Sequence, residues 1–167
     1  QNDEKEILFY KNKCTGCGRC RDLTVDNENF ICFNGAKDIC GKEYAPEEIL
    51  KEVIKDRVFY KNSGGGVTFS GGEPLLQADF VRELFSLCKK EGINTCLDTS
   101  GNRLDDGVRA LLEVTDRVLL DVKYTDGELY KKHVGCQLEK PLDFLDYLNS
   151  KGIATIKKQK KMLPHFM

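Results

Sequence analysis

Three cysteines near the start of the chain have a spacing that suits an iron–sulfur site. Cys14, Cys17 and Cys20 form C-x-x-C-x-x-C, which wraps three thiolates around one corner of an iron–sulfur cube. Zinc is the alternative for clustered cysteines, but zinc sites usually add a second C-x-x-C or a histidine, and neither completes this motif. We therefore predict a cluster, with Cys32 as the best fourth ligand and Cys40 as the fallback.

Two further motifs combine open backbone with polar side chains. Gly71, Gly72 and Glu73 directly follow a predicted strand; adjacent glycines let the backbone approach a ligand closely, and a carboxylate can accept hydrogen bonds from an ammonium group. Asp98 and Thr99 stand at the end of the next predicted strand. Alone, either motif would more often be an ordinary turn or a helix cap.

A third motif places two charges late in a strand predicted over residues 117–123. Because side chains alternate along a strand, Asp121 and Lys123 share one face and offer an acceptor and a donor together. Charges in a buried parallel strand are costly unless they are paired or functional, so an internal ion pair is the alternative. Carboxylates, a lysine and open backbone around one mouth suit a zwitterionic amino-acid ligand.

The elements that must position these motifs alternate between strand and helix. Strands are predicted over residues 67–70, 93–98, 117–123 and 153–157, and helices from Pro46 and over residues 79–91, 105–114, 127–133 and 141–151. This order predicts a parallel sheet with right-handed crossovers, and ligands of such folds bind where the strands end. A closed eight-stranded barrel takes about 250 residues, so we expect an α/β fold that forms part of a barrel.

The rest of the chain has a different character. Residues 1–45 show no sustained helical or strand period, which suits a small module held together by ligands. Residues 46–156 form the predicted partial barrel. Residues 157–167 carry clustered lysines and are predicted to be a solvated, atypical tail.

Bulk composition excludes several classes of function. With 26 basic and 27 acidic residues among 167, the formal charge is -1, so we expect no nucleic-acid or membrane partner. No apolar run approaches the roughly 20 residues of a membrane helix, and the first residues lack a signal-peptide core, which predicts a cytoplasmic protein. In a reducing cytosol, eight cysteines argue for metal before disulfides. Cys88 and Cys96 are interpreted as small core residues, and Cys136 has no motif around it.

Taken together, these stretches resemble the activating enzymes of glycyl-radical enzymes, of the pyruvate formate-lyase activase type, within the radical S-adenosylmethionine (SAM) superfamily. The resemblance covers residues 44–155 and is carried by three matches in order, over residues 62–77, 88–101 and 120–123. It implies a partial radical-SAM βα barrel and an oxidoreductase that uses SAM and a 4Fe-4S cluster. These cofactors generate a 5′-deoxyadenosyl radical, which abstracts a hydrogen atom from a glycine of the partner enzyme.

The resemblance also assigns roles to residues of the strand-end motifs. Gly71, Gly72 and Glu73 are expected to hold the methionine amino group of SAM. Asp121 and Lys123 are expected to line the rest of the SAM site. The reaction itself would come from the cofactors more than from these side chains.

Three further expectations follow from the same resemblance. Asp98 and Thr99, with the carbonyl of Leu119, match positions that the family uses for a monovalent cation. Residues 1–45 resemble the ferredoxin-like insert of longer activases, in which the segment from Cys32 replaces the usual Cys-Pro-x-Gly-Ala. The implied partners are a glycyl-radical enzyme as protein substrate and a flavodoxin or ferredoxin-type electron donor.

Two departures from the family pattern accompany this resemblance. The catalytic C-x-x-x-C-x-x-C of the superfamily is not among the eight cysteines, and the family's Arg-containing strand does not follow Thr155. Because the first residue is also Gln1 rather than Met, we expect a fragment or an interrupted reading frame. The alternative function is a non-catalytic iron–sulfur electron-transfer protein; a phosphate-binding barrel that uses residues 64–66 is a weaker one.

Overall fold

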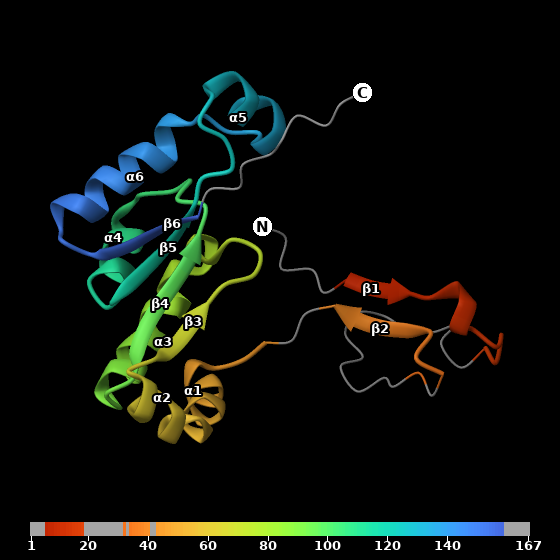
Figure 1. Cartoon of the computed structure of the whole chain (residues 1–167). Helices are drawn as coiled ribbons and strands as arrows, with labels where there is room; N and C mark the ends of the chain where they lie inside the picture. The colour runs from red at the N-terminus through yellow and green to blue at the C-terminus, as the bar shows by residue number, and fades with distance from the viewer. Residues whose placement is uncertain (1–5, 19–31, 33, 41–42, 159–167) are drawn as a thin grey trace. The chain divides into compact units, whose positions relative to one another are not determined.

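The computed structural model describes residues 6–18, 32, 34–40 and 43–158, and the chain divides into two compact units, Gln1–Tyr44 and Ala45–Met167 (Figure 1). In the first unit, β1 (Glu6–Phe9) and β2 (Lys37–Cys40) pair antiparallel, and a short 3-10 turn, η1 (Lys11–Lys13), follows β1. No strand was predicted here, because the two strands are short and lie far apart in the sequence, without the turn signal of a tight hairpin.

The second unit contains the predicted parallel sheet. Its strands are β3 (Gly66–Phe69), β4 (Asn94–Thr99), β5 (Arg117–Asp121) and β6 (Ala154–Lys158), in the spatial order β3-β4-β5-β6. All three neighbouring pairs are parallel, so their carboxyl ends lie at one edge. The register pairs Asp98 with Leu119 and Asp121 with Lys158. β5 ends at Asp121, two residues before the predicted end, and β6 includes two of the lysines predicted to belong to the tail.

Helices connect the strands as predicted, with two additions. They are α1 (Pro46–Lys55), α3 (Ala78–Lys90), α4 (Asp106–Leu112), α5 (Gly127–Val134) and α6 (Glu139–Ser150). The additions are α2 (Arg57–Ser63) and the 3-10 helix η2 (Pro74–Gln77). α2 was not predicted, because its sequence lacks the apolar stripe of an amphipathic helix; in agreement with this, none of its residues is buried. No helix in the described part of the chain is long and apolar enough to cross a bilayer.

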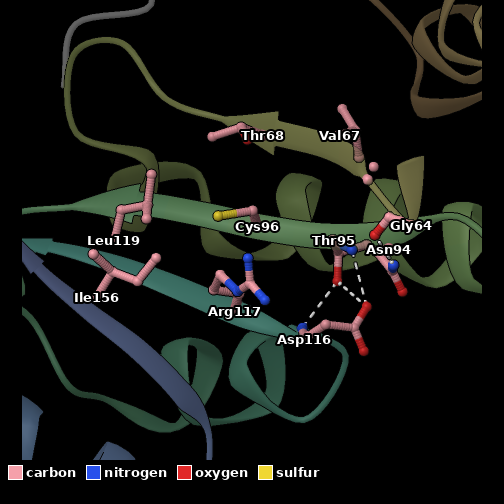
Figure 2. Close-up of a pocket in the computed structure, with 12 residues that line it drawn as sticks. Gly64, Val67, Thr68, Asn94, Thr95, Cys96, Asp116, Arg117, Leu119 and Ile156 are labelled. Atoms are coloured by element: carbon pink, nitrogen blue, oxygen red, sulfur yellow. Dashed lines mark hydrogen bonds between the residues drawn. The ribbon is translucent and has the colours of Figure 1, made fainter. Parts of the chain in front are cut away.

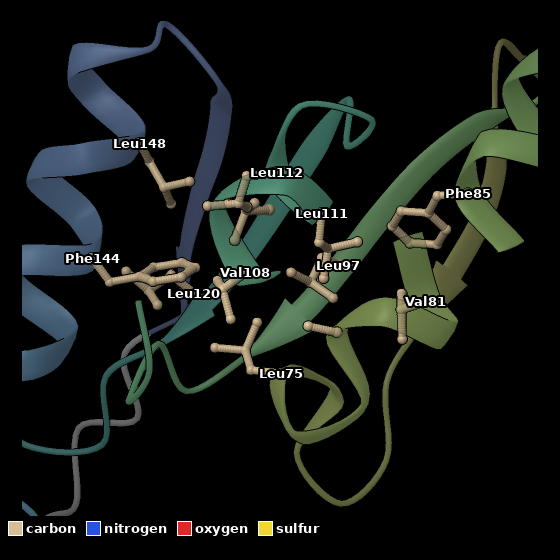
Figure 3. Close-up of a cluster of buried hydrophobic side chains, with 12 residues drawn as sticks. Leu75, Val81, Phe85, Leu97, Val108, Leu111, Leu112, Leu120, Phe144 and Leu148 are labelled. Atoms are coloured by element: carbon tan, nitrogen blue, oxygen red, sulfur yellow. The ribbon is translucent and has the colours of Figure 1, made fainter. Parts of the chain in front are cut away.

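The hydrophobic core lies between one face of the sheet and the helices (Figure 3). Leu97 and Leu120 are fully buried on this face, against Phe85 of α3 and Phe144 of α6. Side chains alternate along a strand, so Asp98, Leu119 and Asp121 point to the opposite face, where Leu119 is only partly buried. No described helix of this unit packs its buried residues on that face, which we call the helix-free face. The sheet therefore has one apolar, covered face and one face whose polar side chains remain accessible.

Candidate functional site

The loop after β3 has an open, left-handed backbone at its two glycines. Gly71 and Gly72 have φ angles of 86° and 50°, a region that favours glycine. A Cβ atom added to either would meet no atom within 4 Å. Glycine is thus required by the backbone conformation rather than by crowding, and there is free space beside this loop. This space suits the predicted close approach of a ligand to the backbone.

Glu73 connects the ends of β3 and β4. Its carboxylate accepts hydrogen bonds from Thr99 Oγ1 at 2.5 Å, from the backbone N–H of Ser100 at 3.1 Å and of Leu75 at 3.2 Å, and from the Ser100 hydroxyl. A carboxylate offers about four lone-pair sites, so the chain itself occupies them all. An incoming ammonium group would have to share these oxygens. The role predicted for this side chain in ligand binding stays a prediction, and its observed role is to join two loops.

The hydrogen-bond network of Glu73 continues to a third loop. Asn102 donates from Nδ2 to the Ser100 hydroxyl at 2.9 Å and accepts from the Cys136 thiol at 3.2 Å. Cys136 lies between α5 and α6, so the loops after β3 and β4 are tied to the connection between these two helices. Sequence reasoning missed Asn102 and Cys136, because neither belongs to a recognisable motif and only the fold brings them together.

A buried tyrosine lies beside this network. Tyr130 of α5 is fully buried, and its hydroxyl has no hydrogen-bond partner among the described residues. Burial raises the pKa of Tyr130 to about 12, and Cys136, Asp121 and Glu73 add to the shift. The Cys136 thiol is close enough to influence this pKa, but no hydrogen bond of acceptable geometry joins it to the hydroxyl. The phenol is therefore protonated at neutral pH.

Four charged side chains form a row on the helix-free face at the carboxyl ends of the strands, and we call Asp98, Lys158, Asp121 and Lys123 the charge row. Lys158 Nζ lies 2.7 Å from Asp98 Oδ2, and Lys123 donates to the Asp121 carboxylate. The hydrogen bond to Asp98 raises the pKa of Lys158, with Asp121 adding to the effect. The predicted pair Asp121 and Lys123 thus occurs as the ion pair that was the alternative interpretation.

The structure does not place Asp98 and Thr99 on the same side of the sheet. Asp98 lies on the helix-free face and is 26% exposed, whereas Thr99 is 3% exposed and its hydroxyl is directed to Glu73. Neighbouring residues of a strand point to opposite faces, so their side chains cannot converge on one ion. Thr99 could reach such an ion only through its backbone.

A pocket of about 400 Å³ lies elsewhere on the sheet, toward the amino ends of β3, β4 and β5 (Figure 2). Its lining includes Thr68, Cys96 and Arg117, together with Leu119 and residues 64–66 of the alternative phosphate-binding interpretation, but none of the residues predicted to bind SAM. Asp116 at its rim accepts hydrogen bonds from the backbone and hydroxyl of Thr95 at 2.9 and 3.1 Å (Figure 2). Partial burial alone would raise the pKa of Asp116, but bonds from Lys89 and Thr95 outweigh it and lower the pKa. The rim carboxylate is thus used structurally.

The predicted cluster ligands belong to the first unit. Cys14 and Cys17 are exposed, and Cys32 is half-buried and accepts a hydrogen bond from the backbone N–H of Ala36 at 3.3 Å. The backbone amides of Lys37 and Ala36 lower the pKa of the Cys32 thiol. Cys20 lies outside the described residues, as does the side chain of Cys40. Within the described part of the chain, no group of three or more His, Cys, Asp or Glu side chains could hold a metal ion, so these residues alone do not fit a cluster.

Comparisons with known proteins bear on the family and the fold of the chain. A family model, the radical SAM superfamily, matches residues 11–159. The chain is 50% identical over 115 residues to the pyruvate formate-lyase 1-activating enzyme of Escherichia coli K12, covering 68% of this chain and 47% of that protein. It is 38% identical over 164 residues to the (2S)-3-sulfopropanediol dehydratase activating enzyme of Klebsiella oxytoca, covering 82% and 51%. A solved domain of pyruvate-formate lyase-activating enzyme from Bacteroides vulgatus matches with a TM-score of 0.52 and 25% identity, over 57% of this chain and 59% of that one.

The chain spans about half the length of the curated relatives that it matches. The family model nevertheless matches most of its residues, including both units, and the parallel sheet has the α/β architecture that the resemblance predicted. The chain therefore belongs to the radical SAM superfamily.

Proposed function

We propose that this chain carries the SAM-binding part of an activating enzyme for a glycyl-radical enzyme. The observation that supports it most is the gathering of three separate sequence motifs at one edge of the parallel sheet, in a member of this superfamily. The relatives are named as activating enzymes, and this chain spans about half their length, so the activity of the whole protein is part of the proposal. In this family, SAM and a reduced 4Fe-4S cluster supply the radical that removes hydrogen from a glycine of the partner.

The residues of this chain would bind and orient SAM rather than react. The backbone around Gly71 and Gly72 is open to the amino-acid part of SAM, since nothing lies within 4 Å of their Cβ positions. Asp121 and Lys123 offer an acceptor and a donor that are both partly exposed. Glu73 keeps the first of these loops in place through its bonds to the loop after β4.

The N-terminal unit completes the proposal. We assign residues 1–45 to a ferredoxin-like 4Fe-4S module with Cys14, Cys17, Cys20 and Cys32 as ligands, on the basis of their spacing and of the amide hydrogen bond to Cys32. The described cysteines do not form a metal site by themselves, so the assignment requires Cys20 as well. The partial barrel, predicted over residues 46–156, would then extend to Lys158, where β6 ends. A flavodoxin or ferredoxin-type electron donor and a cytoplasmic location stay predictions from resemblance and sequence. The resemblance also predicts a monovalent cation at Asp98, but Lys158 already binds that carboxylate.

Calorimetric titration of the purified chain with SAM tests the binding part of this proposal. Lys123→Met should weaken binding at least tenfold, because it removes the donor of the predicted site, whereas Lys132→Met on the exposed surface of α5 should leave the affinity unchanged. The absence of measurable binding to the wild-type chain, or equal losses in both variants, would contradict the proposal.

Anaerobic reconstitution with iron and sulfide tests the chemistry. An activase should form 5′-deoxyadenosine from SAM only when a reductant is added. The chain carries no C-x-x-x-C-x-x-C, so this assay also decides between the two functions that the sequence left open. A good cluster spectrum without any 5′-deoxyadenosine would favour the electron-transfer protein and exclude activase chemistry for this chain.

A further inference from the structure

Lys158 reaches across a whole strand to meet Asp98. The two residues belong to β6 and β4, which are separated by β5. Leu119 of β5 is the register partner of Asp98 and of Ile156, so it lies between the strands that carry the pair. Neighbouring strands are about 4.8 Å apart, and the side chain of Lys158 must therefore extend across the helix-free face to bring Nζ within 2.7 Å of Asp98 Oδ2.

The positions that the family resemblance assigns to a monovalent cation do not fit a free ion in this chain. Asp98 already binds the Lys158 ammonium. The Thr99 hydroxyl donates to Glu73 and accepts from the backbone N–H of Gly101 at 3.1 Å, on the other side of the sheet. An ion at this place would have to displace the lysine first.

We propose that the ammonium group of Lys158 is the resident cation of this site and takes the place of a free monovalent cation. It carries the same single charge as sodium or potassium, and it can donate three hydrogen bonds to surrounding oxygens. Because it is tethered to the same chain, its binding to Asp98 is intramolecular and does not require a dissolved ion to be captured from solution. The inference concerns the site described under the proposed function, but its test uses no SAM.

The surroundings of Lys158 support this role. Asp98 raises the pKa of Lys158, and Asp121, its register partner on β5, adds to this rise, so two carboxylates, each about a quarter exposed, stabilise this ammonium. Without Lys158, Lys123 is the one cation among the described residues that is paired with either of these two carboxylates. Carboxylate and carbonyl oxygens are the ligands that hard cations prefer, so the emptied place would then attract a dissolved cation.

Lys158→Met and Lys157→Met are the matched pair for a test. Lys157 is the preceding residue and points to the opposite face of β6, so it controls for the loss of one positive charge from the same strand. Sodium-23 NMR line widths of the full chain report ion binding directly. Thermal midpoints in sodium chloride and in choline chloride, at equal ionic strength, report the same event through stability.

We expect two results for Lys158→Met only. Its sodium-23 line should broaden, and its thermal midpoint should be about 2–4 °C higher in sodium chloride than in choline chloride. The wild-type chain and Lys157→Met should behave alike in both salts. Adding Asp98→Asn to Lys158→Met should abolish this rise of the thermal midpoint in sodium chloride, because the carboxylate ligand is then missing. Sodium dependence in the wild-type chain, or none in Lys158→Met, would overturn the inference, whether or not SAM binds.

Discussion

Gly101→Ala tests how tightly the loop after β4 is built against the core. Gly101 has a φ angle of 69°, and a Cβ atom there would lie 2.7 Å from Leu120 Cδ1 and 3.1 Å from Phe144 Cδ1. The left-handed backbone costs an alanine about 1–2 kcal/mol. Forcing extra volume against these two fully buried side chains costs about 1–3 kcal/mol more. We therefore expect the free energy of unfolding to fall by about 2–5 kcal/mol.

Gly92→Ala separates the two contributions. Gly92 follows α3 with the same φ angle of 69°, but a Cβ atom there would meet nothing within 4 Å. Only the backbone cost of about 1–2 kcal/mol should appear. Urea unfolding, followed by circular dichroism and tyrosine fluorescence with coincident transitions, measures both variants. Equal destabilisation by the two substitutions would refute the close packing of the Gly101 loop.

Three further outcomes are expected. Glu73→Gln should lower the free energy of unfolding by about 2–3 kcal/mol in urea titrations, because an amide cannot accept from all the present donors. Glu83→Gln, at an exposed position of α3, should leave it unchanged. The free energy of unfolding of the wild-type chain should fall as the pH rises from 10 towards about 12, since the pKa of Tyr130 is raised in the folded state. Tyr130→Phe should lessen that fall. At about pH 8 this variant should be at least as stable as the wild-type chain, because the buried hydroxyl that it removes has no partner among the described residues. In the cluster-free chain, mass spectrometry after iodoacetamide treatment should find Cys14 modified and Cys88 protected, because burial shields that thiol and raises its pKa.

The sequence predicted the parallel sheet because its signals are local. β3 and β5 contain short apolar runs, and the long helix α3 has an apolar stripe, so the predicted boundaries fall within a few residues of those observed. It did not predict α2, whose exposed Val58 and Phe59 form no such stripe. Nor did it predict β1 and β2, because their pairing depends on contacts between distant segments.

The sequence predicted which residues belong to the candidate site, but not which other residues their side chains bind. The strand-end motifs indicated Glu73, Asp98 and Asp121, since strand ends are where parallel sheets bind ligands. Their bonds depend on residues without any motif, such as Asn102 and Lys158. The lysine was interpreted as part of a solvated tail, because nothing in a linear sequence shows that its side chain crosses β5. Such long-range hydrogen bonds and ion pairs become visible only once the register of the strands is known.

The charge row has a consequence for how a ligand first meets this protein. Its two carboxylates and two ammonium groups alternate and cancel, so the electric field that they project into solvent decays over a short distance. Long-range steering would therefore contribute little, and the rate of encounter with a zwitterion should hardly change with ionic strength. Discrimination between ligands would then begin only after contact, when a ligand competes for individual members of the row.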